Sequence, residues 1–275
     1  MTNQPIGVFD SGFGGLTILK ELVTALPAYD YLYLGDNARA PYGHKSFDIV
    51  YEYTKEAVDW FFNRGCNLVI LACNTASAKA LRSIQQENLP LLKDSNKRVL
   101  GVIRPTAEVI GTLSRAGHVG VLGTNGTVQS ESYLMEIAKF FPEVQVTQEA
   151  CPEWVSLVEE NRCDSEEAHH YVALHLNNII NQDPQIDTLL LACTHYPLLM
   201  KTIKSHLPDE IRIVSQGEIV ANSLKKYLEK HPHMENNCSK QGITTFYTTG
   251  DCSDFNSHAS LFFGKSVTAH RLNLK

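Results

Sequence analysis

The sequence predicts an α/β fold made of two pseudo-symmetric lobes, each a largely parallel sheet flanked by helices, with a candidate active site in the cleft between them. Two observations indicate the class: short apolar runs alternate with longer amphipathic stretches, and the apolar runs are continuous. A third observation, the recurrence of two strand motifs in the same order, indicates the two lobes. Continuous apolar strands separated by helices are typical of parallel βαβ units, in which ligands bind beyond the carboxyl ends of the strands.

Each strand is predicted from a short apolar run between turn residues. The predicted strands are 6–10, 31–35, 68–72, 98–103, 119–123, 188–192 and 211–214, with a last one near 244–250. Each helix is predicted from apolar residues that recur every three to four positions. The predicted helices are 16–26, 48–65, 132–141, 165–182 and 217–229.

The repeat concerns the ends of two strands in each half of the chain. IGVFDSGFGG (6–15) resembles VGVLGTNGTV (119–128), and VILACNT (69–75) resembles LLLACTH (189–195). Because both matches keep their order and nearly their spacing, we predict two related lobes. The first lobe comprises 1–98 and 211–275, and the second comprises 99–210. The final segment is therefore expected to pack back on the first lobe.

The composition is that of an ordinary globular protein, with 43% hydrophobic residues, 20% charged residues, a net charge of −6 and a pI of about 6.0. This mild acidity, without a basic stripe, argues against nucleic acid or an anionic membrane as a partner. No apolar run approaches the roughly 18 residues that cross a bilayer, and the N-terminus shows no signal peptide. The seven cysteines include no C-x-x-C pair, so we expect free thiols in a reducing, cytoplasmic environment.

A cysteine ends a later strand of each predicted lobe. Cys73 follows VILA and precedes Asn74-Thr75, whereas Cys193 follows LLLA and precedes Thr194-His195. If the lobes face each other about a pseudo-twofold axis, the two thiols enter one cleft from opposite sides. That arrangement suits the removal of a proton from one face of a carbon and the return of a proton to the other face.

The neighbours of these cysteines suit the same chemistry. A thiol has a reference pKa of about 8.5, and its neighbours can tune it to act as base or acid near neutral pH. Asp10 and His195 are the expected tuners, one in each lobe. The polar side chains and main-chain N–H groups beside the cysteines are expected to hold carboxylates. The polar residues at these strand ends are Asn74, Thr75 and Thr194, with Ser11, Thr124 and Thr127 after the first strand of each lobe.

Each of these features alone has a simpler interpretation. A single free cysteine after a buried strand is usually a small core residue, and only the repeated pair with its polar followers argues against this. The DSGFGG loop (10–15) is interpreted as a strand-to-helix turn whose glycines supply unusual φ angles, and it lacks the spacing of dinucleotide and Walker loops. His231 and His233 are predicted to be solvated, and the CTH triplet offers no metal spacing, so no metal is expected.

Several ordered motifs carry a resemblance to a known family. They are DSGFGGLT (10–17), GDNARAPYG (35–43), ACNTASA (72–78), GVLGTNGTV (120–128) and LACTHYPLL (191–199), continued by FYTTGD (246–251). Together they resemble the glutamate racemases of the aspartate/glutamate racemase superfamily, over residues 6 to about 250.

The resemblance implies an enzyme that interconverts L- and D-glutamate without a cofactor and supplies D-glutamate for bacterial peptidoglycan. It places the paired catalytic cysteines at Cys73 and Cys193, with Cys193 taking the proton from L-glutamate and Cys73 from D-glutamate. It places the assisting groups at Asp10, His195 and Glu159. Substrate contacts fall on Ser11, Pro41, Tyr42, Gly43, Asn74, Thr75, Thr124, Thr127 and Thr194.

The chain departs from the family pattern at two places. Asn37 stands where the family usually has threonine, and Arg104-Pro105-Thr106 stands where it commonly has Glu-Pro-Gly. The arginine reverses a charge near the expected lobe junction, after a strand predicted to end at Ile103. Within the second motif, Asp36 is expected to hold the loop that carries Tyr42.

Two other functions remain open from the sequence. A racemase or isomerase of another acid, such as aspartate or maleate, could use the same fold, although the complete polar pairs after both cysteines favour glutamate. A two-lobed protein that binds an anion without catalysis would leave both cysteines without a role. The sequence does not determine the oligomeric state, and a homodimer is one arrangement within the resemblance.

Overall fold

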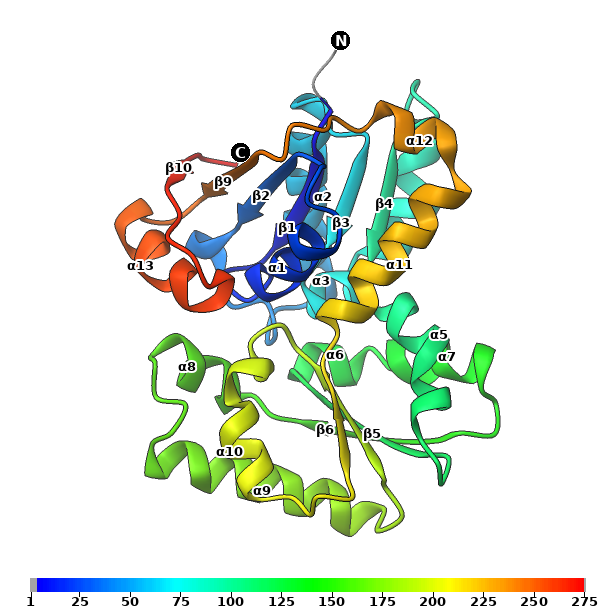
Figure 1. Cartoon of the computed structure of the whole chain (residues 1–275), viewed down its shortest axis with the longest axis vertical. Helices are drawn as coiled ribbons and strands as arrows, with labels where there is room; N and C mark the ends of the chain where they lie inside the picture. The colour runs from blue at the N-terminus through cyan, green and yellow to red at the C-terminus, as the bar shows by residue number, and fades with distance from the viewer. Residues whose placement is uncertain (1–3, 275) are drawn as a thin grey trace.

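The chain forms two parallel sheets flanked by helices, as the sequence predicts. In the computed structural model, which describes residues 4–274, one sheet has six strands in the order β10-β9-β2-β1-β3-β4 and the other has four in the order β6-β5-β7-β8. Every paired strand runs parallel to its neighbour. Figure 1 shows the six-stranded sheet in the upper half of the molecule, near both chain ends, and the four-stranded sheet below it.

The first sheet draws its strands from both ends of the chain. They are β1 (Ile6–Asp10), β2 (Tyr31–Gly35), β3 (Leu68–Leu71), β4 (Arg98–Gly101), β9 (Thr244–Thr248) and β10 (Ala269–Arg271). Its helices are α1 (Leu16–Ala25), α2 (Phe47–Asn63), α3 (Asn74–Lys79), α4 (Leu81–Ser83), α11 (Gly217–Lys230), α12 (Pro232–Asn237) and α13 (Cys252–Phe263), with short turns η1 (Asn37–Arg39), η2 (Ile84–Asn88) and η3 (Leu89–Leu91).

The second sheet is built from one continuous stretch of chain. Its strands are β5 (His118–Gly123), β6 (Gln145–Ala150), β7 (Thr188–Ala192) and β8 (Arg212–Val214). Its helices are α5 (Ile103–Leu113), α6 (Asn125–Gln129), α7 (Ser132–Phe140), α8 (Glu153–Glu159), α9 (Glu166–Gln182) and α10 (Met200–Ser205), with the turn η4 (Tyr196–Leu199).

The predicted lobe boundaries do not coincide with the edges of the sheets. The boundary after residue 98 cuts through β4, which pairs with β3 in the first sheet from Arg98 to Gly101. The boundary after residue 210 assigns β8 to the first lobe, but β8 pairs with β7 in the second sheet. The chain therefore passes from one sheet to the other a few residues later than predicted in both places, because strand pairing continues beyond the predicted boundary.

Three strands differ from the sequence prediction. The strand expected over 98–103 ends at Gly101, and α5 begins at Ile103, so the sequence Arg104-Pro105-Thr106 lies in the first turn of a helix. The edge strands β6 and β10 were not predicted: β6 reads QVTQEA and is only partly buried, and β10 has three residues. An apolar run is therefore a poor guide where a helix directly follows a strand or where a strand lies at an edge.

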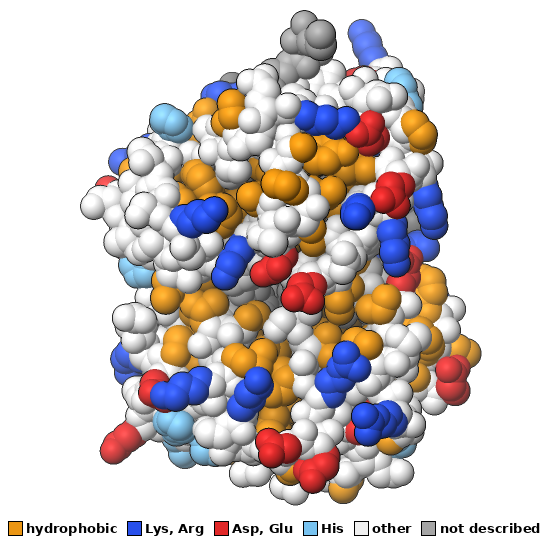
Figure 2. Space-filling view, in the orientation of Figure 1, with side chains coloured by type: hydrophobic (Ala, Val, Ile, Leu, Met, Phe, Trp, Pro, Cys, Tyr) orange, Lys and Arg blue, Asp and Glu red, His pale blue; other side chains and the backbone are white. Residues whose placement is uncertain are grey.

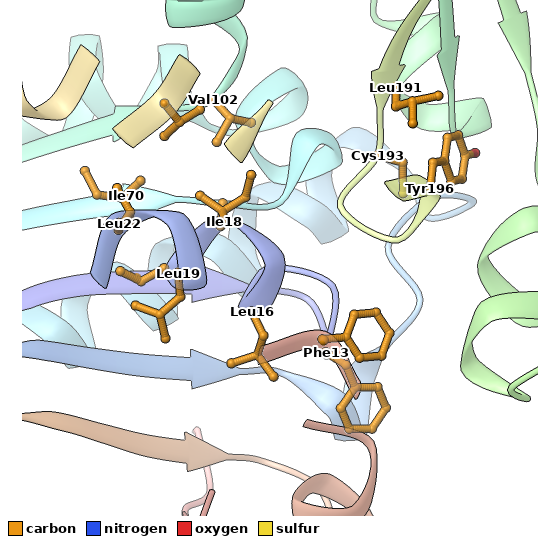
Figure 3. Packing of buried hydrophobic residues seen from close by; sticks show 14 of the residues in the cluster. Phe13, Leu16, Ile18, Leu19, Leu22, Ile70, Val102, Leu191, Cys193 and Tyr196 are labelled. Atoms are coloured by element: carbon orange, nitrogen blue, oxygen red, sulfur yellow. The ribbon is translucent and has the colours of Figure 1, made fainter. Parts of the chain in front are cut away.

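The hydrophobic core is continuous between the two sheets. One buried cluster contains Leu16 and Ile18 of α1 together with Leu191, Cys193 and Tyr196 from the end of β7 and the turn after it. Figure 3 shows these residues on the two sides of the junction. Because this interior is closely packed, it fixes the position of the carboxyl end of β1 relative to that of β7.

The surface carries charges of both signs. Figure 2 shows basic and acidic side chains interspersed over one face, with no basic stripe on that face. Over residues 4–274, no helix combines the length and the apolar character needed to cross a membrane.

Candidate active site

The two cysteines predicted to act together occupy equivalent positions in the two sheets. Cys73 follows β3 and caps the N-terminus of α3, and Cys193 follows β7. Each side chain is 6% exposed. The charge of Cys193 adds to the raised pKa of Cys73. The structure therefore places one thiol at the carboxyl end of each sheet, where parallel folds bind ligands.

The Cys73 thiol lies among neutral and negatively charged groups. Its Sγ is 3.5 Å from the Ser11 hydroxyl and accepts a hydrogen bond from the main-chain N–H of Ala76 at 3.4 Å. Burial, followed by the charge of Asp10, raises the pKa of Cys73 to about 12, although both hydrogen bonds oppose the shift. Cys73 is therefore a thiol, and a proton donor, at neutral pH in the free protein.

Asp10 is a fully buried carboxyl group at the end of β1. Its Oδ2 accepts a hydrogen bond from the main-chain N–H of Gly12 at 2.9 Å, while its Oδ1 has no hydrogen-bond partner among the described residues. Burial raises the pKa of Asp10, and the nearby charge of His195 opposes this shift. A carboxyl group with a raised pKa and a free oxygen is suited to exchange a proton with a neighbour.

Cys193 has a cationic neighbour. Its Sγ lies 3.9 Å from His195 Nδ1, and the other ring nitrogen, Nε2, lies 3.0 Å from Glu159 Oε1 at the end of α8. Burial lowers the pKa of His195, but the hydrogen bonds to Cys193 and Glu159 outweigh it and raise the pKa to about 10. The imidazole is therefore protonated at neutral pH, and it places a positive charge beside Cys193.

The glycines of the DSGFGG loop allow close approach between the two halves of the site. A Cβ atom on Gly14 would lie 2.2 Å from Thr194 Oγ1 and 2.5 Å from His195 Nδ1, and one on Gly15 would lie 2.4 Å from Asp10 Cβ. Neither glycine has a positive φ. The interpretation of these glycines as residues with unusual φ angles is therefore wrong. The loop requires glycine at these positions because a side chain would clash with neighbouring residues.

Asp36 anchors the loop that carries Tyr42, as predicted. The Tyr42 hydroxyl donates a short hydrogen bond to Asp36 Oδ2, which also accepts from Arg39 Nε at 2.7 Å. Thr249 Oγ1 donates to the other carboxylate oxygen at 2.8 Å. Because its hydroxyl is committed to Asp36, Tyr42 can offer a ligand its ring and its main-chain N–H.

Polar side chains from the two sheets meet beside the cysteines. Thr75 Oγ1 lies 3.0 Å from Thr124 Oγ1, which lies 3.1 Å from Thr127 Oγ1. The main-chain N–H of Gly126 donates to the Gly43 carbonyl at 2.7 Å. The predicted contact residues that are buried here are Tyr42, Asn74, Thr75, Thr124, Thr127 and Thr194, while Ser11 and Gly43 are partly buried and Pro41 is exposed.

Some residues at this site have no signal in the sequence. Tyr133 and Gln216 hydrogen-bond Asn74, and Thr17 Oγ1 donates to the Thr194 carbonyl at 3.1 Å. These residues lie in or beside helices. The pattern of apolar and polar residues there predicts which side chains are buried, but it does not predict which partners they contact. Arg104 is exposed and pairs with Glu108 at 2.9 Å.

The described residues include no arrangement of three or more His, Cys, Asp or Glu side chains suited to a metal ion. His231 and His233 are exposed, as predicted.

Comparisons with known proteins agree with this geometry. A model of the family described as Asp/Glu/Hydantoin racemase matches residues 6–224. A glutamate racemase of Geobacter metallireducens is 42% identical over 226 residues, which cover 82% of this chain and 80% of that protein. A glutamate racemase of Ruegeria sp. is 38% identical and covers 96% of this chain and 98% of that protein. The chain belongs to the Asp/Glu/Hydantoin racemase family.

Solved members of this family share the whole architecture. A crystal structure of glutamate racemase isoform RacE1 from Bacillus anthracis superposes with a TM-score of 0.89 at 33% identity, over 100% of this chain and 99% of that one. A glutamate racemase from Francisella tularensis, in complex with D-glutamate, superposes with a TM-score of 0.86 at 28% identity over the same shares. This family membership confirms the resemblance seen in the sequence.

Proposed function

We propose that this protein interconverts L- and D-glutamate by moving protons between its two cysteines and the α-carbon, without a cofactor, and supplies D-glutamate for peptidoglycan. The observation that carries the proposal is the pair of thiols at matching ends of β3 and β7, one beside a carboxyl group and one beside an imidazolium. The curated relatives at 38–42% identity are glutamate racemases, and the chain covers most of their length.

In the L-to-D direction, Cys193 is the base and Cys73 is the acid. The Cys193 thiolate takes the α-proton, the electron pair of the C–H bond stays on the α-carbon, and the Cys73 thiol donates a proton to the opposite face. Cys193 ends as a thiol and Cys73 as a thiolate, so the total charge is unchanged. The D-to-L direction reverses these roles, and protons exchanged with solvent restore the starting state.

Asp10 and His195 are proposed to assist the two thiols in turn. His195, protonated and paired with Glu159, stabilises the Cys193 thiolate before the reaction. Asp10 lies beside Cys73 with a raised pKa, so it can accept and return the proton that Cys73 exchanges. General acid–base assistance of this kind typically contributes about 10²–10⁴-fold to a rate.

The substrate carboxylates are proposed to bind the polar groups that surround the thiols. Donors near Cys73 and Cys193 come from main-chain N–H groups and from short side chains at the ends of strands. These residues are Ser11, Asn74, Thr75, Thr124, Thr127 and Thr194, with Pro41, Tyr42 and Gly43 contributing the loop that Asp36 anchors. Tyr42 and Gly43 are proposed to donate from the main chain.

The seven cysteines are all free, which supports the proposal that the protein works in the reducing cytoplasm. A homodimer remains a prediction.

The alternative substrate is aspartate. An aspartate racemase of Picrophilus torridus shares the fold with a TM-score of 0.55 at 18% identity, a likeness that concerns the fold alone. Rates measured on both amino acids separate the two: glutamate should be turned over faster by at least tenfold. A protein that binds glutamate but leaves its optical rotation unchanged for hours would instead be a two-lobed anion-binding protein.

The decisive experiment follows the α-hydrogen in D₂O. When two different thiols act on opposite faces, the product receives its hydrogen from a thiol that has exchanged with solvent. Product formed early should therefore carry deuterium while unreacted substrate keeps protium, in both directions. Product that retains protium at early times would contradict the two-base mechanism.

A further inference from the structure

A closed ring of hydrogen bonds holds the side chain of Asn74. The Tyr133 hydroxyl donates to Asn74 Oδ1 at 2.6 Å, and Asn74 Nδ2 donates to Gln216 Oε1 at 2.7 Å. Gln216 Nε2 closes the ring by donating to the Tyr133 oxygen at 2.6 Å. The three side chains are between 0% and 3% exposed. Each therefore donates once and accepts once within the ring, in a place where water does not compete.

The ring joins three parts of the chain that carry the site. Asn74 begins α3, directly after Cys73, and Tyr133 lies in α7 of the second sheet. Gln216 lies between β8 and α11, where the chain returns from the second sheet to the first. Its Nε2 also lies 2.9 Å from Thr106 Oγ1 and 3.3 Å from the Val102 carbonyl, at the first crossing. Both crossings are thus tied to the residue that follows Cys73.

The ring also fixes which atoms Asn74 can offer to a ligand. An asparagine amide has two N–H donors and an oxygen with two lone pairs. Tyr133 occupies one lone pair and Gln216 one N–H, and a flipped amide would lose both bonds. Burial raises the pKa of Tyr133, so its hydroxyl remains a donor. One Asn74 N–H, with a fixed direction, remains for an anionic group.

We propose that Tyr133 and Gln216 are positioning residues of the racemase, which hold the Asn74 amide so that its remaining N–H binds a substrate carboxylate. This proposal rests on the proposed function. Both residues act through Asn74 and not on the reacting carbon. Tyr133 belongs to α7, beside the second sheet, and Asn74 follows β3 of the first sheet, so the ring spans the two sheets. The ring therefore links substrate binding to the relative position of the sheets.

The test is a double-mutant cycle between Tyr133→Phe and Asn74→Ala. Removing one buried hydrogen bond should lower kcat/KM about tenfold in Tyr133→Phe, since about 1.4 kcal/mol corresponds to tenfold. The change should fall mainly on KM, because the ring orients a binding group. In the Asn74→Ala background, Tyr133→Phe should change kcat/KM less than twofold, because the group through which it acts is gone.

Tyr31→Phe is the matched control. The Tyr31 hydroxyl is also buried, and it shares its hydrogen between the Leu22 and Leu26 carbonyls. Tyr31 begins β2, at the opposite end of the sheet from Cys73. This variant should lose thermal stability as Tyr133→Phe does, yet keep kcat/KM within twofold of the wild type. If Tyr133→Phe does not fold, the same cycle with Gln216→Met decides the question.

Two results would overturn the proposal. One is a Tyr133→Phe variant that keeps wild-type kcat/KM, as the control does. The other is a Tyr133→Phe substitution that lowers kcat/KM by the same factor in the Asn74→Ala background as in the wild type. Calorimetric titration with glutamate repeats the cycle with binding, instead of kcat/KM, as the readout. A wild type that binds but does not racemise glutamate would contradict the proposed function, while the binding cycle would still decide the role of the ring.

Discussion

The surroundings of Cys73 and Cys193 differ in charge although the two cysteines end equivalent strands. Burial and the charge of Asp10 raise the pKa of Cys73, although the hydrogen bond with the Ser11 hydroxyl opposes this shift. Cys193 lies beside His195, whose pKa is raised by its hydrogen bonds with Cys193 and Glu159. The internal repeat therefore preserves the position of the thiol and not the charge of its neighbours.

This difference sets the starting point of the reaction. At neutral pH the free protein presents a thiol at Cys73 and an imidazolium at His195, beside Cys193. That combination is ready to take a proton from L-glutamate, and it must be inverted before D-glutamate can react. A symmetrical reaction is thus carried out by an asymmetrical pair.

The largest effect is expected from removing either thiol. Cys73→Ala and Cys193→Ala should each reduce racemisation in both directions by at least about 10³-fold, because each direction needs one base and one acid. The remaining thiol can still exchange the α-hydrogen of one enantiomer: L-glutamate in Cys73→Ala and D-glutamate in Cys193→Ala. Proton NMR in D₂O measures this exchange. A Cys193→Ala variant that racemises at the parent rate would exclude the paired mechanism.

Replacing the assisting groups should have an intermediate effect. Asp10→Asn and His195→Asn should each slow turnover by about 10²–10⁴-fold while glutamate still binds. Because the two groups serve different thiols, His195→Asn should reduce kcat more from L-glutamate, and Asp10→Asn more from D-glutamate. Steady-state kinetics in both directions, with calorimetry for binding, provides the comparison. Unchanged turnover in both variants would show that the helpers are assigned wrongly.

Alkylation should distinguish the thiols by about tenfold or more. The thiolate is the reactive form, so chloroacetamide at pH 8 should label Cys193 before Cys73, although both are 6% exposed. Site-resolved mass spectrometry gives the two rates, and D-glutamate should protect both cysteines. In His195→Asn the preference for Cys193 should decrease. Equal labelling of the two cysteines in the wild type would remove the proposed asymmetry.

The smallest effect concerns stability against pH. The pKa of His195 is raised from 6.5 to about 10 in the folded protein, so its protonation stabilises the fold fully below about pH 6.5. That contribution is lost as the pH rises through about 10. The free energy of unfolding of the wild type relative to His195→Asn should therefore decrease between these values. Urea unfolding at several pH values measures it, and a constant difference would contradict the raised pKa.

Much of the fold could be predicted because its central strands are buried on both faces. β1 and β7 are continuous apolar runs with every residue buried, so their sequence alone identifies them. β6 could not be predicted because it lies at a partly exposed edge of the sheet and its sequence, QVTQEA, is mostly polar. The end of β4 could not be predicted because apolar residues continue from the strand into the start of α5.

The site could be predicted only where a residue stands at the end of a strand. The role of Cys73 and Cys193 could be predicted from the few residues on either side of each cysteine. Tyr133 and Gln216 do not, because they meet Asn74 from 59 and 142 residues away. The reason for Gly14 was equally invisible, since its Cβ would clash with Thr194 of the other sheet and not with its own turn. Contacts between the sheets have no local pattern from which to be read.

The return of the last strands to the first sheet has a consequence for how the chain is made on the ribosome. β2 pairs on one side with β1, but its other partner is β9, with Tyr31 opposite Thr244. The four strands of the second sheet are synthesised in between and need no later residue for their pairing. The second sheet can therefore be completed during translation while β2 still presents an open edge, which is the kind of edge that pairs with other chains. The domain that starts first is the one that finishes last, and chaperones would be needed most in that interval.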